Sequence, residues 1–286
     1  MAAPVGTFHP GAAPFGNFIN YYSFNPPEKR IRFLPDDLLR VISNVGRKRN
    51  VAVLDVGCNA GNLTEALYLH LTKPNLSQAE ETEDSLTHAA STDEANDDIS
   101  NTAEMSHLSR DSLSVSVNVL GCDIDETLIF RAHESNSFPK NIAYRTVDFM
   151  CDASRQSNLT EFLSSRDSET IDRFDLVCCF SITMWIHLQH GDAGLRKFLT
   201  EAARLSRYLL VEPQPWKCYK SALRRVRKVG IENSWRFTEL TMRENVDENI
   251  RDYLTSACQM ELVRTLGETH WERKLLLFRN TSDTDS

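Results

Sequence analysis

The sequence of 286 residues predicts an α/β fold, in which a mostly parallel sheet carries helices on both faces. Short apolar runs alternate with longer helix-like segments along the chain, which is the pattern of repeated βαβ units. Two of these runs end in an acidic residue, and a glycine-rich turn follows the first of them at once. Apolar residues make up 41% of the chain, which is enough for the core of one large domain.

Seven strands and six helices are expected, in an order that mostly alternates. The expected strands are residues 51–56, 116–122, 142–147, 174–180, 207–212, 259–265 and 272–278. The expected helices lie near residues 61–72, 125–135, 157–165, 191–205, 217–229 and 247–257. Little room remains for a helix between the last two strands, where Gly267 to His270 predict a hairpin loop. We therefore expect about seven strands with a C-terminal antiparallel hairpin.

A single domain is expected over residues 16–280, between a flexible N-terminus (1–15) and a flexible tail (281–286). An insert at about residues 74–114 interrupts it. Within the insert, residues 78–111 hold ten acidic residues and one basic residue, so this segment carries −9 of a net charge of −8. Such a segment cannot bury enough apolar surface to fold, so we expect it to be disordered. The rest of the chain is close to neutral, and the net charge therefore does not exclude an RNA substrate.

The glycine-rich turn follows the first expected strand and predicts a nucleotide-type binding site. Gly57 and Gly61 allow the backbone to pass close to a ligand, and the next helix offers free N–H groups at its start. Asn59 stands where a dinucleotide site needs glycine for the pyrophosphate. S-adenosylmethionine (SAM) has no pyrophosphate, so the turn favours a methyltransferase over a dehydrogenase. A plain tight turn is the alternative interpretation.

Polar and aromatic residues follow the other expected strands, at the edge where α/β sheets bind ligands. Asp123 ends the second strand and suits the two hydroxyls of a ribose. Asp148 and Phe149 fit an adenine ring, or equally a helix cap followed by an apolar anchor. Phe180 is either a wall of the binding site or an ordinary core residue.

Two further positions suggest contact with a substrate. His187 follows an apolar and aromatic run and is either a functional residue or a core histidine with internal partners. Gln214 lies between two prolines at the end of the fifth strand, so it belongs to a stiff loop. That loop places Gln214 and Trp216 beside the cofactor, which indicates substrate recognition.

Cations gather in two segments. One is a stretch without acidic residues that is either a solvated helix face or a contact for a phosphate backbone. The other, an N-terminal arm, mixes aromatic and basic residues like a flap over the ligand, and Pro26-Pro27 argues against one regular helix there. The first segment contains Lys217, Lys220, Arg224, Arg225, Arg227 and Lys228, and the arm contains Phe18, Tyr21, Tyr22, Lys29, Arg30 and Arg32.

The seven cysteines are scattered, with no C-x-x-C pair and no zinc-binding spacing. We therefore expect no metal site and reduced thiols. The N-terminus lacks the features of a signal peptide, and no run of eighteen apolar residues predicts a membrane span. A cytoplasmic protein is expected.

The motifs L-D-V-G-C-N-A-G, D-I-D, D-F-M, S-I-T-M-W-I-H and V-E-P-Q-P-W-K-C-Y, with G-N-F…Y-Y near the start, resemble the bicoid-interacting family of RNA 5′-phosphate methyltransferases. The resemblance runs from about Gly16 to Phe278. It implies a Rossmann-like class I SAM-dependent methyltransferase domain. Met184 stands where the branch that caps a small nuclear RNA has lysine, so the chain is closer to the branch that acts on 5′-monophosphates of histidine tRNA and precursor microRNA.

The resemblance also implies a cofactor site. Asp123 would hold the ribose, Asp148 and Phe149 the adenine, and Arg30 the methionine carboxylate of SAM. The full predicted cofactor set is Arg30, Asn59, Asp123, Asp148, Phe149 and Phe180, to which the turn geometry adds Gly57. The predicted contacts of the methyl-accepting phosphate are Tyr21, Tyr22, His187, Gln214 and Lys217.

The expected activity is O-methylation of an RNA 5′-monophosphate. A terminal phosphate is already anionic near neutral pH, so the reaction needs no strong general base. The expected partner is 5′-monophosphorylated RNA, with no DNA and no membrane, and the protein is expected to be a monomer. Two alternatives remain, a SAM-dependent enzyme for a small molecule or protein, and a non-catalytic RNA-binding module of the same fold.

Overall fold

The computed structural model describes residues 15–43, 50–73, 115–165, 173–229, 235–269 and 271–283. The predicted acidic insert at about residues 74–114 lies outside the described residues, as do residues 1–14 of the predicted flexible N-terminus. A seven-stranded sheet runs through the described part in the order β3-β2-β1-β4-β5-β7-β6. The first five strands pair in parallel, and β7 is antiparallel to both β5 and β6. The strands are β1 (Asn50–Val56), β2 (Ser116–Asp123), β3 (Ile142–Thr146), β4 (Phe174–Phe180), β5 (Ser206–Glu212), β6 (Met260–Glu268) and β7 (Lys274–Asn280).

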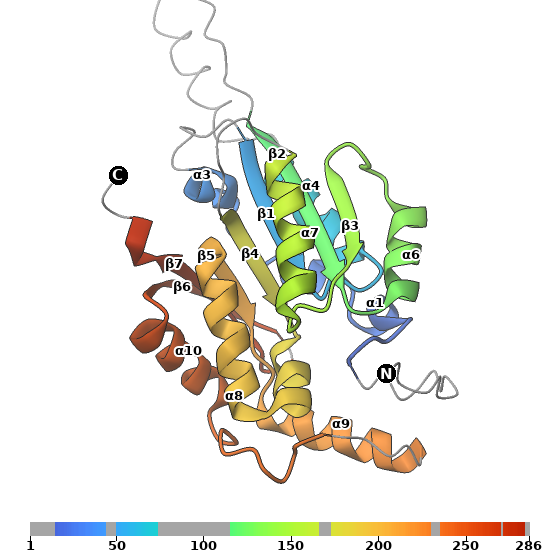
Figure 1. Ribbon diagram of the computed structural model, residues 1–286, viewed down its shortest axis with the longest axis vertical. Coiled ribbons are helices and arrows are strands. Elements are labelled where there is room, and N and C mark those ends of the chain that lie inside the picture. The colour runs from blue at the N-terminus through green and yellow to red at the C-terminus, as the bar shows by residue number, and fades with distance from the viewer. Residues whose placement is uncertain are drawn as a thin grey trace, which may run out of the picture.

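Helices cover both faces of the sheet, as expected (Figure 1). One face carries α7 (Asp152–Ser164), α8 (Thr183–Arg204) and α10 (Val246–Ala257). The other carries α4 (Asn62–Thr72) and α6 (Glu126–Ser135), together with part of the N-terminal arm. The helix α9 (Trp216–Val229) lies beyond the carboxyl ends of the strands, which is the edge where ligands bind in such sheets.

Two apolar layers form the core, one on each side of the sheet. Alternate residues of β1 point to opposite sides, so Leu54 and Val56 pack toward α7 and α8 while Val51 and Val53 pack toward α4. All four are buried. A parallel strand covered on both faces must be apolar on both, which explains why the sequence shows uninterrupted apolar runs rather than alternation.

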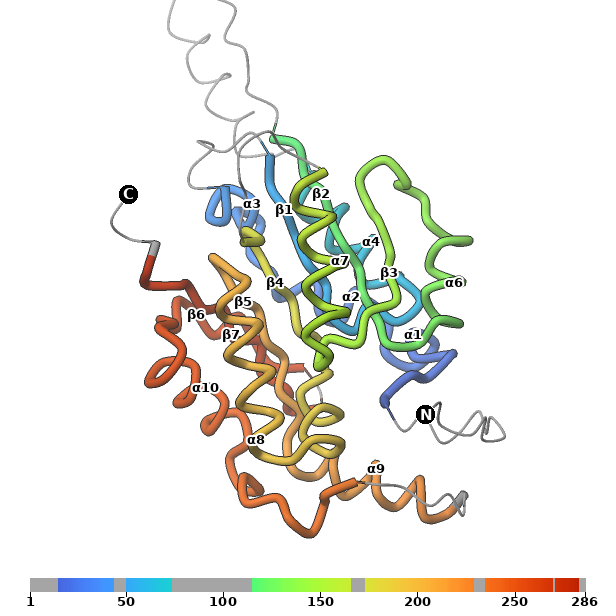
Figure 2. Tube along the Cα trace, viewed as in Figure 1, coloured from blue at the N-terminus to red at the C-terminus, as the bar shows by residue number. Residues whose placement is uncertain are grey.

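The N-terminal arm forms three short helices, α1 (Tyr21–Phe24), α2 (Glu28–Ile31) and α3 (Leu38–Ile42), of which α2 and α3 pack against α4. Figure 2 shows the arm entering beside α4 and leading into β1. The break between α1 and α2 falls at Asn25 and the two following prolines, in agreement with the sequence.

The expected start of α8 is wrong by eight residues. A helix was expected from residue 191, but α8 begins at Thr183, and Gly191 is a kink within it (φ 68°). The backbone N–H of Met184 and the hydroxyl of Thr183 both donate to the side-chain oxygen of Gln214, each at a distance of 3.0 Å. This cap comes from a residue far along the chain, so local sequence could not predict it.

The hairpin also differs from expectation. Gly267 and Glu268 belong to β6 and not to the loop, and β7 begins two residues later than expected. The strands pair with two register shifts, which let β6 bend and lengthen. After β7, Thr281–Asp283 form a 3₁₀ turn at the start of the segment expected to be flexible. No helix in the described part of the chain is long and apolar enough to cross a membrane.

Candidate functional site

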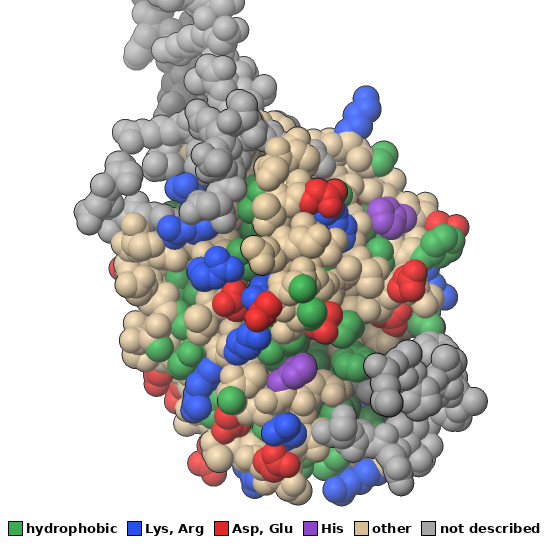
Figure 3. Space-filling model, in the orientation of Figure 1, with side chains coloured by type: hydrophobic (Ala, Val, Ile, Leu, Met, Phe, Trp, Pro, Cys, Tyr) green, Lys and Arg blue, Asp and Glu red, His purple; other side chains and the backbone are tan. Residues whose placement is uncertain are grey.

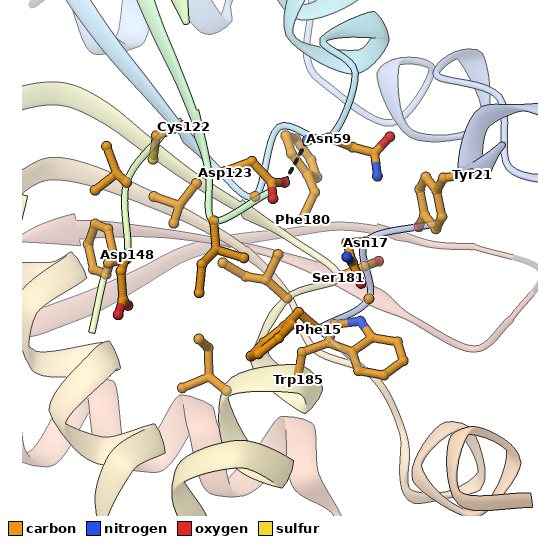
Figure 4. A pocket seen from close by; sticks show the side chains of 18 of the residues that line it. Phe15, Asn17, Tyr21, Asn59, Cys122, Asp123, Asp148, Phe180, Ser181 and Trp185 are labelled. Carbon is orange, nitrogen blue, oxygen red and sulfur yellow. Dashed lines mark hydrogen bonds between the residues drawn. The ribbon is translucent and has the colours of Figure 1, made fainter. Parts of the chain in front are cut away.

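A pocket of about 310 Å³ opens at the carboxyl ends of β1, β2, β3 and β4. Figure 4 shows Asp123 and Phe180 on the strand side, Phe15 and Trp185 facing them, and Tyr21 at one end. All seven predicted cofactor residues line it, as do Tyr21 and Tyr22 of the predicted phosphate set. The pocket therefore brings together residues from the N-terminal arm, the glycine-rich turn and four strand ends.

The glycine-rich turn is tied to the neighbouring strand. The backbone N–H groups of Gly57 and Cys58 both donate to the carbonyl of Cys122, at 2.8 and 3.0 Å. The next donor, the Asn59 N–H, reaches a carboxylate oxygen of Asp123 at 2.9 Å, and the second oxygen accepts from the Asp125 N–H at 3.0 Å. Each oxygen keeps a free lone pair, so Asp123 can still accept the two hydroxyls of a ribose.

The N-terminal arm closes one side of the pocket. The Asn59 side chain donates to the carbonyl of Phe18 at 3.1 Å, and Asn17 donates to Asp125 at 2.7 Å. The hydroxyl of Tyr22 donates to the carbonyl of Cys58 at 3.3 Å. Asn59 therefore holds the arm in place, a role that the motif comparison did not suggest.

Asp148 and Phe149, which follow β3, each combine a structural role with a place in the pocket lining. Phe149 is 5% exposed, packs edge-on against Phe198 at 5.2 Å and still lines the pocket. One oxygen of Asp148 accepts from the Met150 N–H at 2.9 Å, and the exposed side chain leaves the other oxygen for a ligand. Core packing thus fixes the ring of Phe149 where an adenine could lie against it.

Arg30 lines the pocket and lies at the centre of a buried polar cluster. Its Nε binds a carboxylate oxygen of Glu212 at 2.7 Å, and its Nη2 donates to Tyr21 at 2.6 Å and Ser181 at 2.9 Å. Ser181 in turn donates to the same oxygen of Glu212. Arg30 is only 1% exposed. Its predicted contact with the methionine carboxylate stays a prediction, because two of its nitrogens already bind protein partners.

Three residues of the predicted phosphate set lie outside the pocket lining. His187 is fully buried, with its ring nitrogens on Tyr219 at 3.0 Å and Asp192 at 2.7 Å, which matches the core-histidine alternative. Gln214 is used up by the cap of α8 and by the carbonyl of Ser181. Lys217 is exposed and forms an ion pair with Glu272 at 2.6 Å. In the described structure the polar atoms of His187 and Gln214 are therefore engaged by protein partners.

The sequence did not single out several pocket residues on the first turns of α8. Trp185, Ile186, Gln189 and His190 line the pocket, and their i, i+1, i+4, i+5 spacing puts them on one helix face. That signal was unreadable because the segment was expected to be a loop. Ser181, whose positive φ of 57° turns the chain from β4 into α8, was also missed.

Comparisons with known proteins give close relatives over nearly the full chain. The pre-miRNA 5′-monophosphate methyltransferase of Xenopus laevis is 43% identical, over 94% of this chain and 93% of the relative. The chain belongs to the bicoid-interacting protein 3 family. The family model itself, "Bicoid-interacting protein 3 (Bin3)", matches residues 174–280.

Two more relatives mark the range of this family. The RNA 5′-monophosphate methyltransferase of Bos taurus is 41% identical over 97% of this chain and 84% of the relative. The 7SK snRNA methylphosphate capping enzyme of Mus musculus is 26% identical over 72% of this chain and 31% of the relative. The identity is thus higher to the monophosphate enzymes than to the capping enzyme.

The pocket of this Bin3-family protein fits SAM. Asp123 offers two partly free oxygens, Phe149 and Phe180 offer apolar walls, and the turn from Gly57 to Asn59 admits a ligand close to the backbone. The oxygens of Asp123 match a ribose, the apolar walls match an adenine, and the turn matches the thioether chain. The fit rests on residues from both the arm and the strand ends.

Replacement of Gly57 by alanine is expected to lower the free energy of unfolding and to weaken SAM binding. Gly57 has φ +79°, and a Cβ there would lie 2.3 Å from Cγ2 of Ile182. We expect a loss of about 2–4 kcal/mol, from the left-handed conformation and the overlap together. Urea denaturation measures it. The double variant G57A/I182A should recover the steric part, and a loss below about 1 kcal/mol in G57A would contradict this reading.

Asp55 predicts a pH dependence of stability. Burial raises the pKa of Asp55 to about 6, against the hydrogen bond from Thr64 at 2.6 Å and with a further rise from Asp123. Between about pH 4 and 6 the folded protein therefore holds a proton on Asp55 that the unfolded chain has released. The contribution of Asp55 to the free energy of unfolding consequently falls as the pH rises through this window and is constant above about pH 6. Compared with D55N, the wild type should lose about 3 kcal/mol of unfolding free energy across that window. Denaturation of both proteins at several pH values tests this, and parallel curves would refute it.

Proposed function

We infer that this protein is a SAM-dependent methyltransferase that modifies the 5′-monophosphate of RNA. The observation that carries the inference is the identity above 40%, over more than nine-tenths of the chain, to relatives named for this activity. The pocket supports it, because a SAM-sized site is open at the edge of the sheet where the acceptor can approach.

The chemistry asks little of the protein beyond positioning. When bound, SAM supplies an electrophilic methyl group on its sulfonium sulfur. The accepting phosphate oxygen is anionic near neutrality, since the second pKa of a phosphate monoester is about 6. The chain must therefore align the oxygen, exclude water and balance the phosphate charge. Tyr21 and Tyr22 lie where they can help to align it, and the arm they belong to covers the site.

The helix α9 is the surface that we propose for the RNA backbone. Its exposed Lys220, Arg224, Arg227 and Lys228 form no ion pair with any described carboxylate, and Lys217 pairs with Glu272. We expect these cations to contact phosphates, which makes RNA binding salt-dependent.

The face over α7 and α8 is different. There, basic and acidic side chains are mixed (Figure 3). Asp152 pairs with Arg155 and Lys197, and Glu201 pairs with Arg155 and Arg204. These charges are already balanced within the protein, so this face has less to offer a polyanion.

The finer assignments are proposals as well. We propose histidine tRNA and precursor microRNA as substrates, because the chain carries Met184 in place of the lysine of the capping branch. We also propose a monomer in the cytoplasm. All seven cysteines are free, which suits a reducing compartment.

The test is transfer of a labelled methyl group from SAM to one short hairpin RNA that carries a 5′-hydroxyl, a 5′-monophosphate or a 5′-triphosphate. We expect label on the monophosphate alone. Equal label on the triphosphate would move the protein toward the capping branch. SAM binding without label on any RNA would point to a small-molecule or protein acceptor, and absence of SAM binding would favour the non-catalytic RNA-binding alternative.

A further inference from the structure

Arg273, in the loop of the β6–β7 hairpin, holds an unbalanced positive charge at the edge of the pocket. Its Nη1 donates to the hydroxyl of Ser181 at 2.7 Å, and Ser181 lines the pocket. Its Nη2 has only the weak acceptor Cys218 Sγ at 3.8 Å, and its Nε is buried without a partner in the described structure. The guanidinium is held over the ring of Trp271, 4.7 Å from its centroid. A buried donor without an acceptor is costly and suggests a missing ligand.

Arg225 brings a second guanidinium to the same edge. It lies on α9 seven residues after Cys218, which is two helical turns along the same face. Its guanidinium lies over the ring of Phe18, 5.3 Å from the centroid. Phe18 packs edge-on against Trp185 of the pocket lining, at 6.1 Å. Partial burial lowers the pKa of Arg225, the Cys218 thiol opposes that shift, and the neighbouring Arg273 cation adds to it.

The charges around this edge do not balance. Of the three arginines around this edge, Arg30 is paired with the buried carboxylate of Glu212. Within the described part of the chain, no carboxylate lies within ion-pair distance of Arg225 or Arg273. Two like charges are therefore held near each other at the edge of the pocket, which an anion would stabilise.

We propose that Arg273 and Arg225 form the subsite that receives the terminal 5′-phosphate of the RNA acceptor. The proposal rests on the proposed function and replaces His187, Gln214 and Lys217 as phosphate ligands. A 5′-monophosphate carries close to two negative charges near neutral pH, which matches two guanidinium groups. Methylation removes one of these charges, so the product fits the subsite less well than the substrate.

Binding of two hairpin RNAs that differ only in a 5′-monophosphate or a 5′-hydroxyl tests the subsite. The dissociation constants are measured with saturating S-adenosylhomocysteine, for the wild type and for R273Q, R273K and R225Q. The control is R227Q, which removes the same charge from an exposed position of the same helix. We expect the wild type to prefer the phosphate by roughly tenfold or more. R273Q and R225Q should lose most of this preference, and R273K should keep part of it because it retains charge but not the guanidinium fork. R227Q should weaken both RNAs equally.

Calorimetry with SAM identifies a variant that has lost its fold. If R273Q has lost its fold, R225Q, at an exposed position, is used for the test instead. The subsite would be overturned if the wild type methylates the monophosphate and R225Q and R273K keep the full preference for the phosphate. The proposed function would then still stand. A wild type that neither prefers nor methylates the phosphate would overturn the proposed function itself. Loss of preference in the arginine variants and not in R227Q supports the subsite.

Discussion

Replacement of Asp123 by alanine is expected to lower the affinity for SAM by about 100-fold or more. The carboxylate is 9% exposed, and each of its oxygens accepts one backbone N–H and keeps a lone pair toward the pocket. Charge-assisted hydrogen bonds contribute about 1.5–3 kcal/mol each, and the variant loses two to the ribose. It also frees the N–H groups of Asn59 and Asp125, which loosens the turn. Isothermal titration calorimetry measures the affinity.

The matched control for this prediction is D148A. Asp148 lines the same pocket after the neighbouring strand β3, is exposed, and has one oxygen on the Met150 N–H (Figure 4). We expect its loss to weaken SAM binding by roughly tenfold or less, because solvent competes for a single contact there. Unchanged SAM affinity in D123A, in protein that unfolds at the wild-type temperature, would remove Asp123 from the ribose site.

Replacement of Arg30 by methionine is expected to cost about 3–5 kcal/mol of unfolding free energy. Arg30 and Glu212 are 1% and 0% exposed, and the second oxygen of Glu212 has no partner in the described structure. Removal of the cation leaves a buried carboxylate held by the Ser181 hydroxyl, which cannot balance its charge. Urea denaturation near neutral pH measures the loss. The arm should also loosen, because Arg30 ties it to Glu212 and Ser181.

The double variant R30M/E212M separates charge from packing. With both charges gone the site becomes apolar, so we expect it to recover much of the stability lost in R30M. A loss of less than about 1 kcal/mol in R30M would show that the pair adds little. A double variant as unstable as R30M would show that the geometry of the side chains matters more than their charge.

Local sequence patterns predict most of the sheet. The apolar runs that became β1, β2 and β4 are each buried on both faces, so their composition alone distinguishes them from exposed segments. The glycine-rich turn and Asp123 are predictable for the same reason, since they follow directly from a strand end. The Pro26-Pro27 break in the arm is equally local.

Residues whose role depends on distant partners could not be predicted. The sequence treats Gln214 as a substrate contact, but the fold brings β4 and β5 together and gives its amide to the start of α8. Arg273 and Ser181 are 92 residues apart, and nothing near either residue in the sequence indicates their contact. His187 was weighed both ways, and only its contacts with Tyr219 and Asp192 favour the core.

The sequence by itself therefore determined the α/β class, the cofactor turn and the strand-end residues that line the pocket, because backbone conformation and burial depend on nearby residues. The tertiary structure alone decided which polar side chains remain available to a ligand. The polar atoms of Gln214 and His187 are satisfied by partners that the fold brings close, while Arg225 and Arg273 have no ion-pair partner among the described residues. A polar group can bind a substrate only where the fold has not already supplied its partner.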